Sequence, residues 1–181
     1  MKFLFANLEI ECQEGDITKQ PDMTAIVNAA NAWLRSGGGV AGAIHRVAGP
    51  ELAEECRKFA PLKTGEAVLT KGYKLPNRYV IHCLGPVYGR DKPEDKLLAA
   101  CYENALRLAE EYKIDSLAFP AIATGYFGYP IEEAAEVAIK AILKMAPQLK
   151  SVKKIRFVLF TKKDLEVYQK VLNNLLNPKR Y

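Results

Sequence analysis

The feature that most constrains the fold of this chain is its alternation of short apolar runs with longer segments of helical period. Runs of strand length recur at 2–6, 9–13, 24–29, 66–71, 78–84, 116–122 and 154–160. Segments with apolar residues at helical spacing occupy 40–48, 51–59, 94–112, 131–145 and 163–176. This order predicts an α/β domain, with helices packed on both faces of the sheet and right-handed crossovers between parallel strands.

The expected core follows from the same patterns. The runs 116–122 and 155–160 are almost continuously apolar, which is typical of strands covered on both faces. The helical segments contribute apolar stripes made of Leu98, Cys101, Ala105, Leu108, Tyr112, Ile131, Ala135, Ala138, Ile142, Met145, Leu165, Tyr168, Leu172 and Leu175. No linker or repeat divides the chain, so we expect residues 1–181 to form a single domain.

Several classes of protein are disfavoured by composition. No apolar run approaches the ~20 residues that span a membrane, and the segment 1–5 is too short for a signal-peptide core. We therefore expect a cytoplasmic protein without a membrane partner. The four cysteines lie far apart, and neither His45 nor His82 stands at zinc-finger spacing from them. The sequence thus predicts no metal site and no cofactor.

The segment 28–42 has residue types that suit a sugar diphosphate. A strand at 24–29 leads to the amides Asn28 and Asn31, then to three glycines at 37–39 and a helix start near Val40 without acidic residues. Glycines let backbone N–H groups approach phosphate oxygens, and a helix N-terminus favours negative charge. An asparagine amide can donate to and accept from ribose hydroxyls. On this segment alone, an ordinary turn remains the alternative.

The glycines also match the Gly-x-Gly-x-x-Gly pattern of dinucleotide-binding folds, which ends here at Gly42. That fingerprint requires its first glycine directly after a strand, whereas residues 30–36 intervene in this chain. We therefore reject a Rossmann fold.

A second glycine-containing loop, at 123–130, precedes the helix predicted at 131–145. Gly125 and Gly128 allow close approach of the backbone to a ligand, and the two aromatic residues between them could form a lid or pack into the core. The acidic Glu132 and Glu133 would repel a phosphate on the helix end itself. We therefore expect a phosphate to lie on the loop backbone, shared with the first glycine loop at the carboxyl ends of the strands.

A third short element, Gly-Asp-Ile-Thr at 15–18, follows an early strand. The carboxylate of Asp16 could accept a hydrogen bond from the exocyclic amine of adenine, or it could cap a turn. Both interpretations stay open.

Four segments together resemble the macrodomain family: 15–18, Val-Asn-Ala-Ala-Asn at 27–31, Gly-Gly-Gly-Val-Ala-Gly-Ala-Ile-His at 37–45, and Ala-Thr-Gly-Tyr-Phe-Gly at 123–128. They occur in the family's order and span nearly the whole chain. The resemblance implies a three-layer α/β/α sandwich around a mixed, mostly parallel sheet of six or seven strands, with a cleft for ADP-ribose.

The resemblance also implies roles for particular residues. Asp16 would hold the adenine amine, with Ile17 beside the ring, and Asn31 would hold the distal ribose. The loops 37–40 and 124–128 would wrap the diphosphate. Phe160 resembles the residue that stacks on adenine, although it could equally be a core phenylalanine. The ligand-binding candidates are thus Asp16, Ile17, Asn28, Gly37, Gly38, Gly39, Val40, Thr124, Gly125, Tyr126, Phe127, Gly128 and Phe160.

Catalysis is the point at which this chain departs from many relatives. Members that hydrolyse ADP-ribose esters often carry an aspartate where Ala41 stands, one helical turn before His45. Alanine cannot orient or deprotonate water. Other members with the same Gly-Gly-Gly-Val-Ala pattern are associated with removing mono-ADP-ribose from proteins by a route without a dedicated base. We therefore expect a hydrolase of ADP-ribose esters, on mono-ADP-ribosylated proteins or O-acetyl-ADP-ribose, with Asn31 and His45 as catalytic candidates.

Two alternatives remain. The chain could be a non-catalytic reader of ADP-ribosylated proteins, in which case His45 is structural and donates to the backbone. It could also bind RNA through its basic C-terminal residues, which are part of a formal net charge of +5. These residues are Lys150, Lys153, Lys154, Arg156, Lys162, Lys163, Lys179 and Arg180. No aromatic residues alternate with them, so nucleic acid is the least favoured partner.

Overall fold

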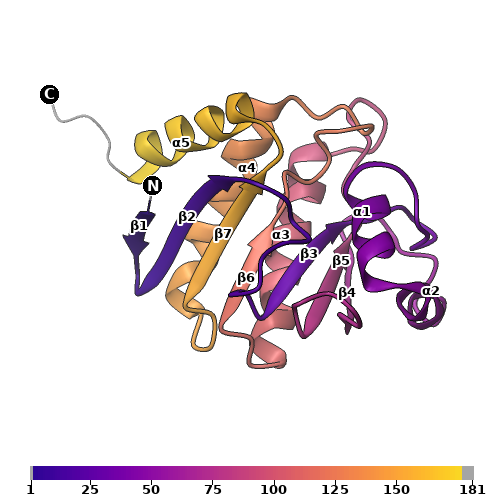
Figure 1. The fold of residues 1–181 in the computed structure, drawn as a ribbon. Helices are drawn as coiled ribbons and strands as arrows, with labels where there is room; N and C mark the ends of the chain where they lie inside the picture. The colour runs from indigo at the N-terminus through magenta and orange to yellow at the C-terminus, as the bar shows by residue number, and fades with distance from the viewer. Residues whose placement is uncertain (1, 177–181) are drawn as a thin grey trace, which may run out of the picture.

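The structure is a computed structural model that describes residues 2–176, and within this range seven strands form one sheet (Figure 1). Their order across the sheet is β1-β2-β7-β6-β3-β5-β4. The strands are β1 (Lys2–Phe5), β2 (Leu8–Glu14), β3 (Ala25–Ala29), β4 (Ala67–Lys71), β5 (Tyr79–Cys83), β6 (Ser116–Phe119) and β7 (Lys154–Leu159). The inner five run parallel, and β1 and β4 pair antiparallel at the two edges. The expected mixed, mostly parallel sheet is confirmed.

Helices cover both faces of this sheet. They are α1 (Gly39–Ala48), α2 (Pro50–Cys56), α3 (Glu94–Glu111), α4 (Ile131–Met145) and α5 (Lys162–Leu176), and a short 3₁₀ helix, η1 (Ala146–Gln148), follows α4. Side chains alternate along β6: Leu117 and Phe119 pack with α3, α4 and α5, whereas Ala118 packs with α1 and α2. The molecule therefore has the three-layer α/β/α architecture that the sequence predicts (Figure 1).

Most elements lie within one or two residues of their predicted positions, and the larger differences have local causes. The sixth strand ends at Phe119 instead of residue 122, because Pro120 has no N–H to donate to the sheet. Ile122 nevertheless remains 1% exposed, so the run is buried without being a strand throughout. Helix α2 ends at Cys56, three residues early, and Tyr112 is 46% exposed just beyond α3, so its assignment to the core is wrong.

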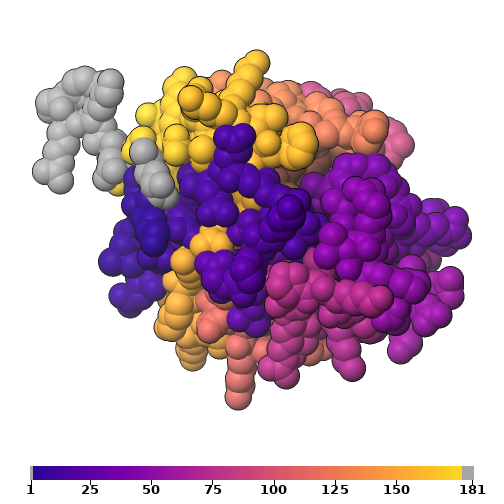
Figure 2. All heavy atoms as spheres, viewed as in Figure 1, coloured from indigo at the N-terminus to yellow at the C-terminus, as the bar shows by residue number. Residues whose placement is uncertain are grey.

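The parallel direction of β2, β7, β6, β3 and β5 places their carboxyl ends along the same edge of the sheet, which we call the carboxyl edge. The connections that leave this edge lie at 15–24, 30–38, 84–93, 120–130 and 160–161. Figure 2 shows how the fold brings distant segments together: the indigo and purple atoms of the first third of the chain border the orange and yellow atoms of the last third.

Candidate functional site

The first glycine loop, residues 37–39, leads directly into α1. All three glycines are exposed, and the first turn of α1 contains no acidic residue and no side-chain cap. Its backbone N–H groups therefore face the carboxyl edge with partial positive charge. Gly42 is needed for this geometry, because a Cβ there would lie 2.1 Å from the carbonyl oxygen of Gly37.

The aromatic loop, residues 123–130, meets this glycine loop. Tyr126 is 92% exposed, yet its ring lies along Gly38, where a Cβ would be 3.2 Å from the ring carbon Cε2. Phe127 is half-buried and packs against the cores on both faces of the sheet. Tyr126 is thus exposed, whereas Phe127 is packed inside. The lid interpretation therefore describes Tyr126, and the core interpretation describes Phe127.

Thr124 shapes the start of the aromatic loop. Its Oγ1 donates to the carbonyl of Ala121 at 2.8 Å, which closes a tight turn directly after the buried run. At Gly125 no heavy atom lies within 4 Å of a built Cβ, and Gly128 has a φ of +73°. The loop backbone is therefore accessible at Gly125 and turns back through a conformation that favours glycine.

Asn31 lies beside the glycine loop, with a built Cβ of Gly37 3.5 Å from its Nδ2. Its Nδ2 donates to the carbonyl of Arg35 at 2.7 Å, and its Oδ1 accepts from the N–H of Arg35 at 3.0 Å. Each arm of the amide keeps one further hydrogen-bonding position. The residue therefore braces the loop and can still contact a hydroxyl group.

Asn28 does not reach the surface. It is 1% exposed, and its Nδ2 lies 3.0 Å from Nδ1 of His82 on the neighbouring strand β5. The other ring nitrogen of His82 lies 2.9 Å from Oγ1 of Thr70 on β4. Burial lowers the pKa of His82 to about 3, so its ring is neutral and can accept from Asn28 while donating to Thr70.

Asn28, His82 and Thr70 thus form a buried polar chain that joins β3, β5 and β4 beneath the loops. This position differs from the expected direct contact of Asn28 with the ligand. His82 and Thr70 were missed as partners, although each is a polar residue within an otherwise apolar strand run.

His45 lies in α1, one turn after Ala41, and both residues are 6% exposed. Burial lowers the pKa of His45, which keeps the ring neutral near pH 7. Its Nε2 has no hydrogen-bond partner among residues 2–176, so the expected donation to the backbone is not seen at this atom. His45 is therefore a buried neutral imidazole within α1.

Asp16 and Phe160 mark the other end of the carboxyl edge. The N–H of Gly15 donates to the carbonyl of Leu159 at 2.9 Å, which holds the two segments side by side. Phe160 is 88% exposed, so the core interpretation of this residue is wrong. Ile17, the residue after Asp16, is only 6% exposed and packs into the core on the α1 and α2 face of the sheet.

Asp16 does form a turn, as one of its two interpretations predicts. Its Oδ1 accepts from the N–H of Thr18 at 2.9 Å and from the Thr18 hydroxyl at 2.7 Å. These hydrogen bonds lower the pKa of Asp16, so the carboxylate is charged near pH 7. The side chain is exposed, and its second oxygen remains accessible to an amine donor.

Gly85 is a further structural residue that sequence reasoning missed. A Cβ there would lie 2.9 Å from Cγ2 of Ile122 and 3.0 Å from Cβ of Ala123. A little further on, the N–H of Tyr88 donates to the carbonyl of Phe127 at 2.8 Å. The connection 84–93 therefore packs closely against the aromatic loop and supports it from behind.

The basic residues near the C-terminus do not form one surface. Arg156 is 7% exposed and pairs with Asp22 at 2.7 Å, and it also donates to Glu11. Lys154, at the start of β7, pairs with two glutamates at 3.3 and 3.4 Å, whereas Lys162 lies beyond the other end of this strand. Lys179 and Arg180 lie outside the described residues.

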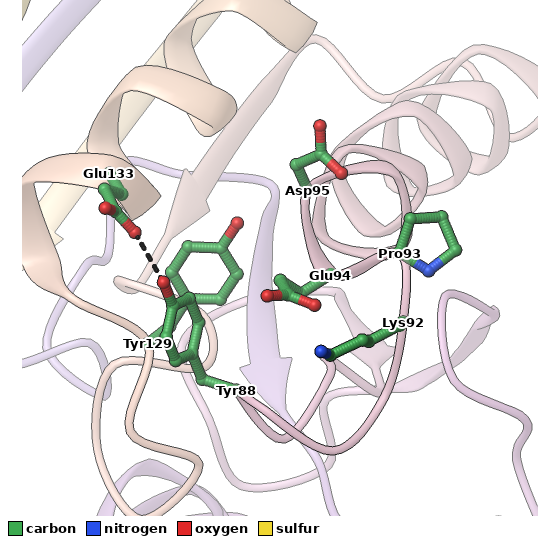
Figure 3. Close-up of a pocket in the computed structure, with 7 residues that line it drawn as sticks. All are labelled: Tyr88, Lys92, Pro93, Glu94, Asp95, Tyr129 and Glu133. Atoms are coloured by element: carbon green, nitrogen blue, oxygen red, sulfur yellow. Dashed lines mark hydrogen bonds between the residues drawn. The ribbon is translucent and has the colours of Figure 1, made fainter.

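Two hollows on the surface are lined by none of the residues predicted for the site. One lies between the starts of α3 and α4, behind the aromatic loop (Figure 3), and the other lies around the connection from β4 to β5. Among residues 2–176 there is no group of three His, Cys, Asp or Glu that could hold a metal ion. No helix in this range has both the length and the apolar character to cross a bilayer.

Known proteins resemble this chain in sequence and in structure. The family model described as Macro domain matches residues 27–138. A solved macrodomain of Oceanobacillus iheyensis with ADP has a TM-score of 0.93 and 41% identity, over 99% of this chain and 97% of that one. A Trypanosoma brucei macrodomain in complex with ADP-ribose has a TM-score of 0.84 and 40% identity, over 90% of this chain and 68% of that one.

One relative that is named as an enzyme is much longer than this chain. The ADP-ribose glycohydrolase MACROD2 of Xenopus laevis is 44% identical over 168 residues, which cover 91% of this chain and 40% of the relative.

Proposed function

The chain belongs to the macrodomain family, and on this premise we propose that it binds ADP-ribose along the carboxyl edge and hydrolyses ADP-ribose esters. The observation that carries the proposal is the meeting of two accessible glycine loops at an acid-free helix start. There the ring of Tyr126 lies against Gly38. Backbone N–H groups at such a place suit a diphosphate. The complexes of the related macrodomains with ADP and ADP-ribose support this choice of ligand.

The two ends of ADP-ribose fit the two ends of the carboxyl edge. Asp16 would accept from the adenine amine, and the exposed ring of Phe160 would stack on the base. Asn31 would use its remaining donor and acceptor positions on the distal ribose. Ile17 and Asn28 would act from below, as packing and as a strand tie, instead of by direct contact.

The hydrolytic step is proposed to use positioning and electrostatics. A water molecule held by a phosphate oxygen of the substrate and by loop N–H groups would attack either the anomeric carbon or the ester carbonyl, while Asn31 fixes the ribose. Attack at the anomeric carbon would break its bond to the ester oxygen and release the carboxylate, and attack at the carbonyl would break the acyl C–O bond and release the ribose hydroxyl. The proton of the water would pass to the phosphate oxygen that holds it or onward to solvent. Ala41 provides no base, and His45 is buried and neutral. The activity named for the Xenopus relative supports hydrolysis, and the substrates proposed here are mono-ADP-ribosylated proteins and O-acetyl-ADP-ribose.

The test is a time course of ADP-ribose release from a protein mono-ADP-ribosylated on glutamate. Wild type should release ADP-ribose, and Asn31→Ala should slow release at least about tenfold, because the ribose loses its positioning contact. Asn174→Ala, an exposed amide on α5, is the matched control and should leave the rate unchanged. Equal release rates in wild type and Asn31→Ala would contradict the hydrolytic role.

Because Asn31 also braces the loop, thermal unfolding must accompany this assay. The proposal requires the rate to fall much more than the stability. Retention of the modified protein by wild type without any release would instead establish a reader, and the buried alanine at position 41 gives that alternative its structural reason.

The remaining aspects of the proposal concern the whole chain. We propose that it acts as a single domain in the cytoplasm, with ADP-ribosylated proteins as partners. RNA binding is not proposed, because Arg156 and Lys154 are engaged with carboxylates and the other described lysines lie at opposite ends of β7.

A further inference from the structure

A second candidate site lies behind the aromatic loop, in a hollow of about 420 Å³ that we call the Tyr129 pocket (Figure 3). Its volume is within the range of small-ligand sites, about 300–1,000 Å³. Two tyrosines, Tyr88 and Tyr129, form one side of it. The charged residues that line it are Lys92, Glu94, Asp95 and Glu133.

The charge of this pocket is negative. Three carboxylates and one ammonium group line it, which gives a formal charge of −3 + 1 = −2. Glu94 and Asp95 stand in the first turn of α3, and Glu133 stands in the first turn of α4. Acidic residues at these positions stabilise helices through the macrodipole, so the carboxylates alone would not define a ligand site.

Tyr129 supplies the independent observation. The residue is 3% exposed and lines the pocket, and its hydroxyl group makes no hydrogen bond to another residue within 2–176. In Figure 3 this hydroxyl points into the space between Glu133 and Asp95. The body of this side chain is therefore buried, while its hydroxyl group reaches the pocket and keeps its hydrogen-bonding positions for a ligand there.

The surroundings of this hydroxyl group favour a cation as the ligand. The hydroxyl of Tyr88 donates to Oε2 of Glu133 at 3.1 Å. The rings of Tyr88 and Tyr129 pack edge to face, with their centroids 4.9 Å apart. Burial, followed by the nearby carboxylates, raises the pKa of Tyr129 to about 12, so the phenol stays neutral and can accept a hydrogen bond. Carboxylates beside aromatic rings favour an alkylammonium or guanidinium group.

We propose that the Tyr129 pocket binds the ammonium or guanidinium group of a lysine or arginine side chain on a polypeptide partner. Tyr129 directly follows Gly128 of the aromatic loop, and Tyr88 is hydrogen-bonded to Phe127 in the same loop. A polypeptide seated at the carboxyl edge is therefore near enough to place a basic side chain here. The exposed Lys92 already lines part of the pocket, and the proposal requires its ammonium group to give up this place to the ligand cation. None of the residues assigned to ADP-ribose lines the pocket, so the proposal stands without that function.

The experiment is an NMR titration of the ¹⁵N-labelled protein with two short peptides, acetyl-Gly-Arg-Gly-amide and acetyl-Gly-Lys-Gly-amide. Amide shifts should concentrate at Tyr129, Glu133 and Glu94. The same peptide with citrulline, a neutral isostere of arginine, should give none. Binding should weaken at least about fivefold in Tyr129→Phe and in Glu133→Gln, because each removes one partner of the cation.

Glu132→Gln is the matched control. It makes the same change in net charge on the same helical turn, but Glu132 does not line the pocket and only approaches Lys170 at 3.9 Å. This variant should bind the peptides like wild type. All variants should retain wild-type ADP-ribose affinity, which shows that they fold and separates this proposal from the previous one.

Three outcomes would overturn the inference: no shifts with either basic peptide, equal shifts with the citrulline peptide, or unchanged affinity in Tyr129→Phe and Glu133→Gln. Spermidine provides a further arm of the test. Binding of spermidine without binding of either peptide would assign the pocket to a free polyamine and reject a polypeptide partner.

Discussion

At the scale of single residues, Asn31 shows how one amide can serve both the loop and a ligand. Two of its hydrogen-bonding positions are used on the backbone of Arg35. The other two remain for a sugar, which the sequence alone could suggest but not demonstrate. Asn28 has the same side chain three positions earlier, yet it points into the sheet toward His82. The direction of each amide depends on where β3 ends, and a residue count along the chain does not reveal it.

Ala41 offers the sharpest prediction at this scale. Ala41→Asp places a carboxylate in the first turn of α1, on the helix face that carries His45. It should raise the rate of ADP-ribose release at least about tenfold, because a general base can add 10²–10⁴-fold to such a reaction. The measurement is release under single-turnover conditions.

The control for this substitution is Ala43→Asp, which adds the same charge to the same helix on a different face. It should not accelerate release. An unchanged or lower rate in Ala41→Asp would mean that the water is already positioned without a carboxylate here.

At the scale of elements, periodicity and turn residues predicted nearly every helix and strand, because each has a buried face of its own. The start of α1 and the aromatic loop were also predicted, since glycines and an acid-free helix start are visible in sequence. The pocket at Tyr129 was not, because it depends on how α3 and α4 begin side by side. The pairing of Gly42 with the carbonyl of Gly37 was equally hidden, since only the folded backbone brings them together.

Gly42→Ala tests that contact between loop and helix. The added methyl group would lie 2.1 Å from the Gly37 oxygen, so the glycine loop must move away from α1. We expect a loss of about 1–3 kcal/mol in the free energy of unfolding from overpacking, reduced by the higher helix propensity of alanine. ADP-ribose affinity should fall at least about tenfold.

Calorimetric titration and urea unfolding measure the two effects. Gly125→Ala is the stability control, because no heavy atom lies within 4 Å of its built Cβ. Stability of Gly42→Ala equal to that of Gly125→Ala would contradict the clash.

At the scale of the whole molecule, the parallel inner strands are what assemble the site. The segments that contain Asp16 and Phe160 are brought side by side because β2 and β7 are neighbours that point the same way. The resemblance to a family predicted this convergence, whereas composition and periodicity predicted only the class of fold. Beneath the loops, the neutral ring of His82 joins β3, β5 and β4 and so links the stability of the sheet to pH.

Protonation of His82 should destabilise the fold. Its pKa is about 3 in the folded protein and about 6.5 in an unfolded chain, so the unfolded state binds the extra proton between these values. The free energy of unfolding should therefore fall as pH falls from about 6.5, by at most about 1.4 kcal/mol per pH unit for this residue. The lowered pKa of His45 acts in the same direction.

Urea unfolding from about pH 7 to about pH 4.5 measures this slope. In His82→Gln the slope should be smaller, although the protein is less stable throughout. A slope identical to that of wild type would show that His82 does not remain neutral in the folded state.

The contact between Gly42 and Gly37 also has an evolutionary consequence. Any amino acid with a Cβ at position 42 displaces the carbonyl of the loop in front of it. We expect a substitution there to keep ligand binding only when a compensating change in the loop accompanies it. We therefore expect the loop and the first turn of α1 to vary as one unit.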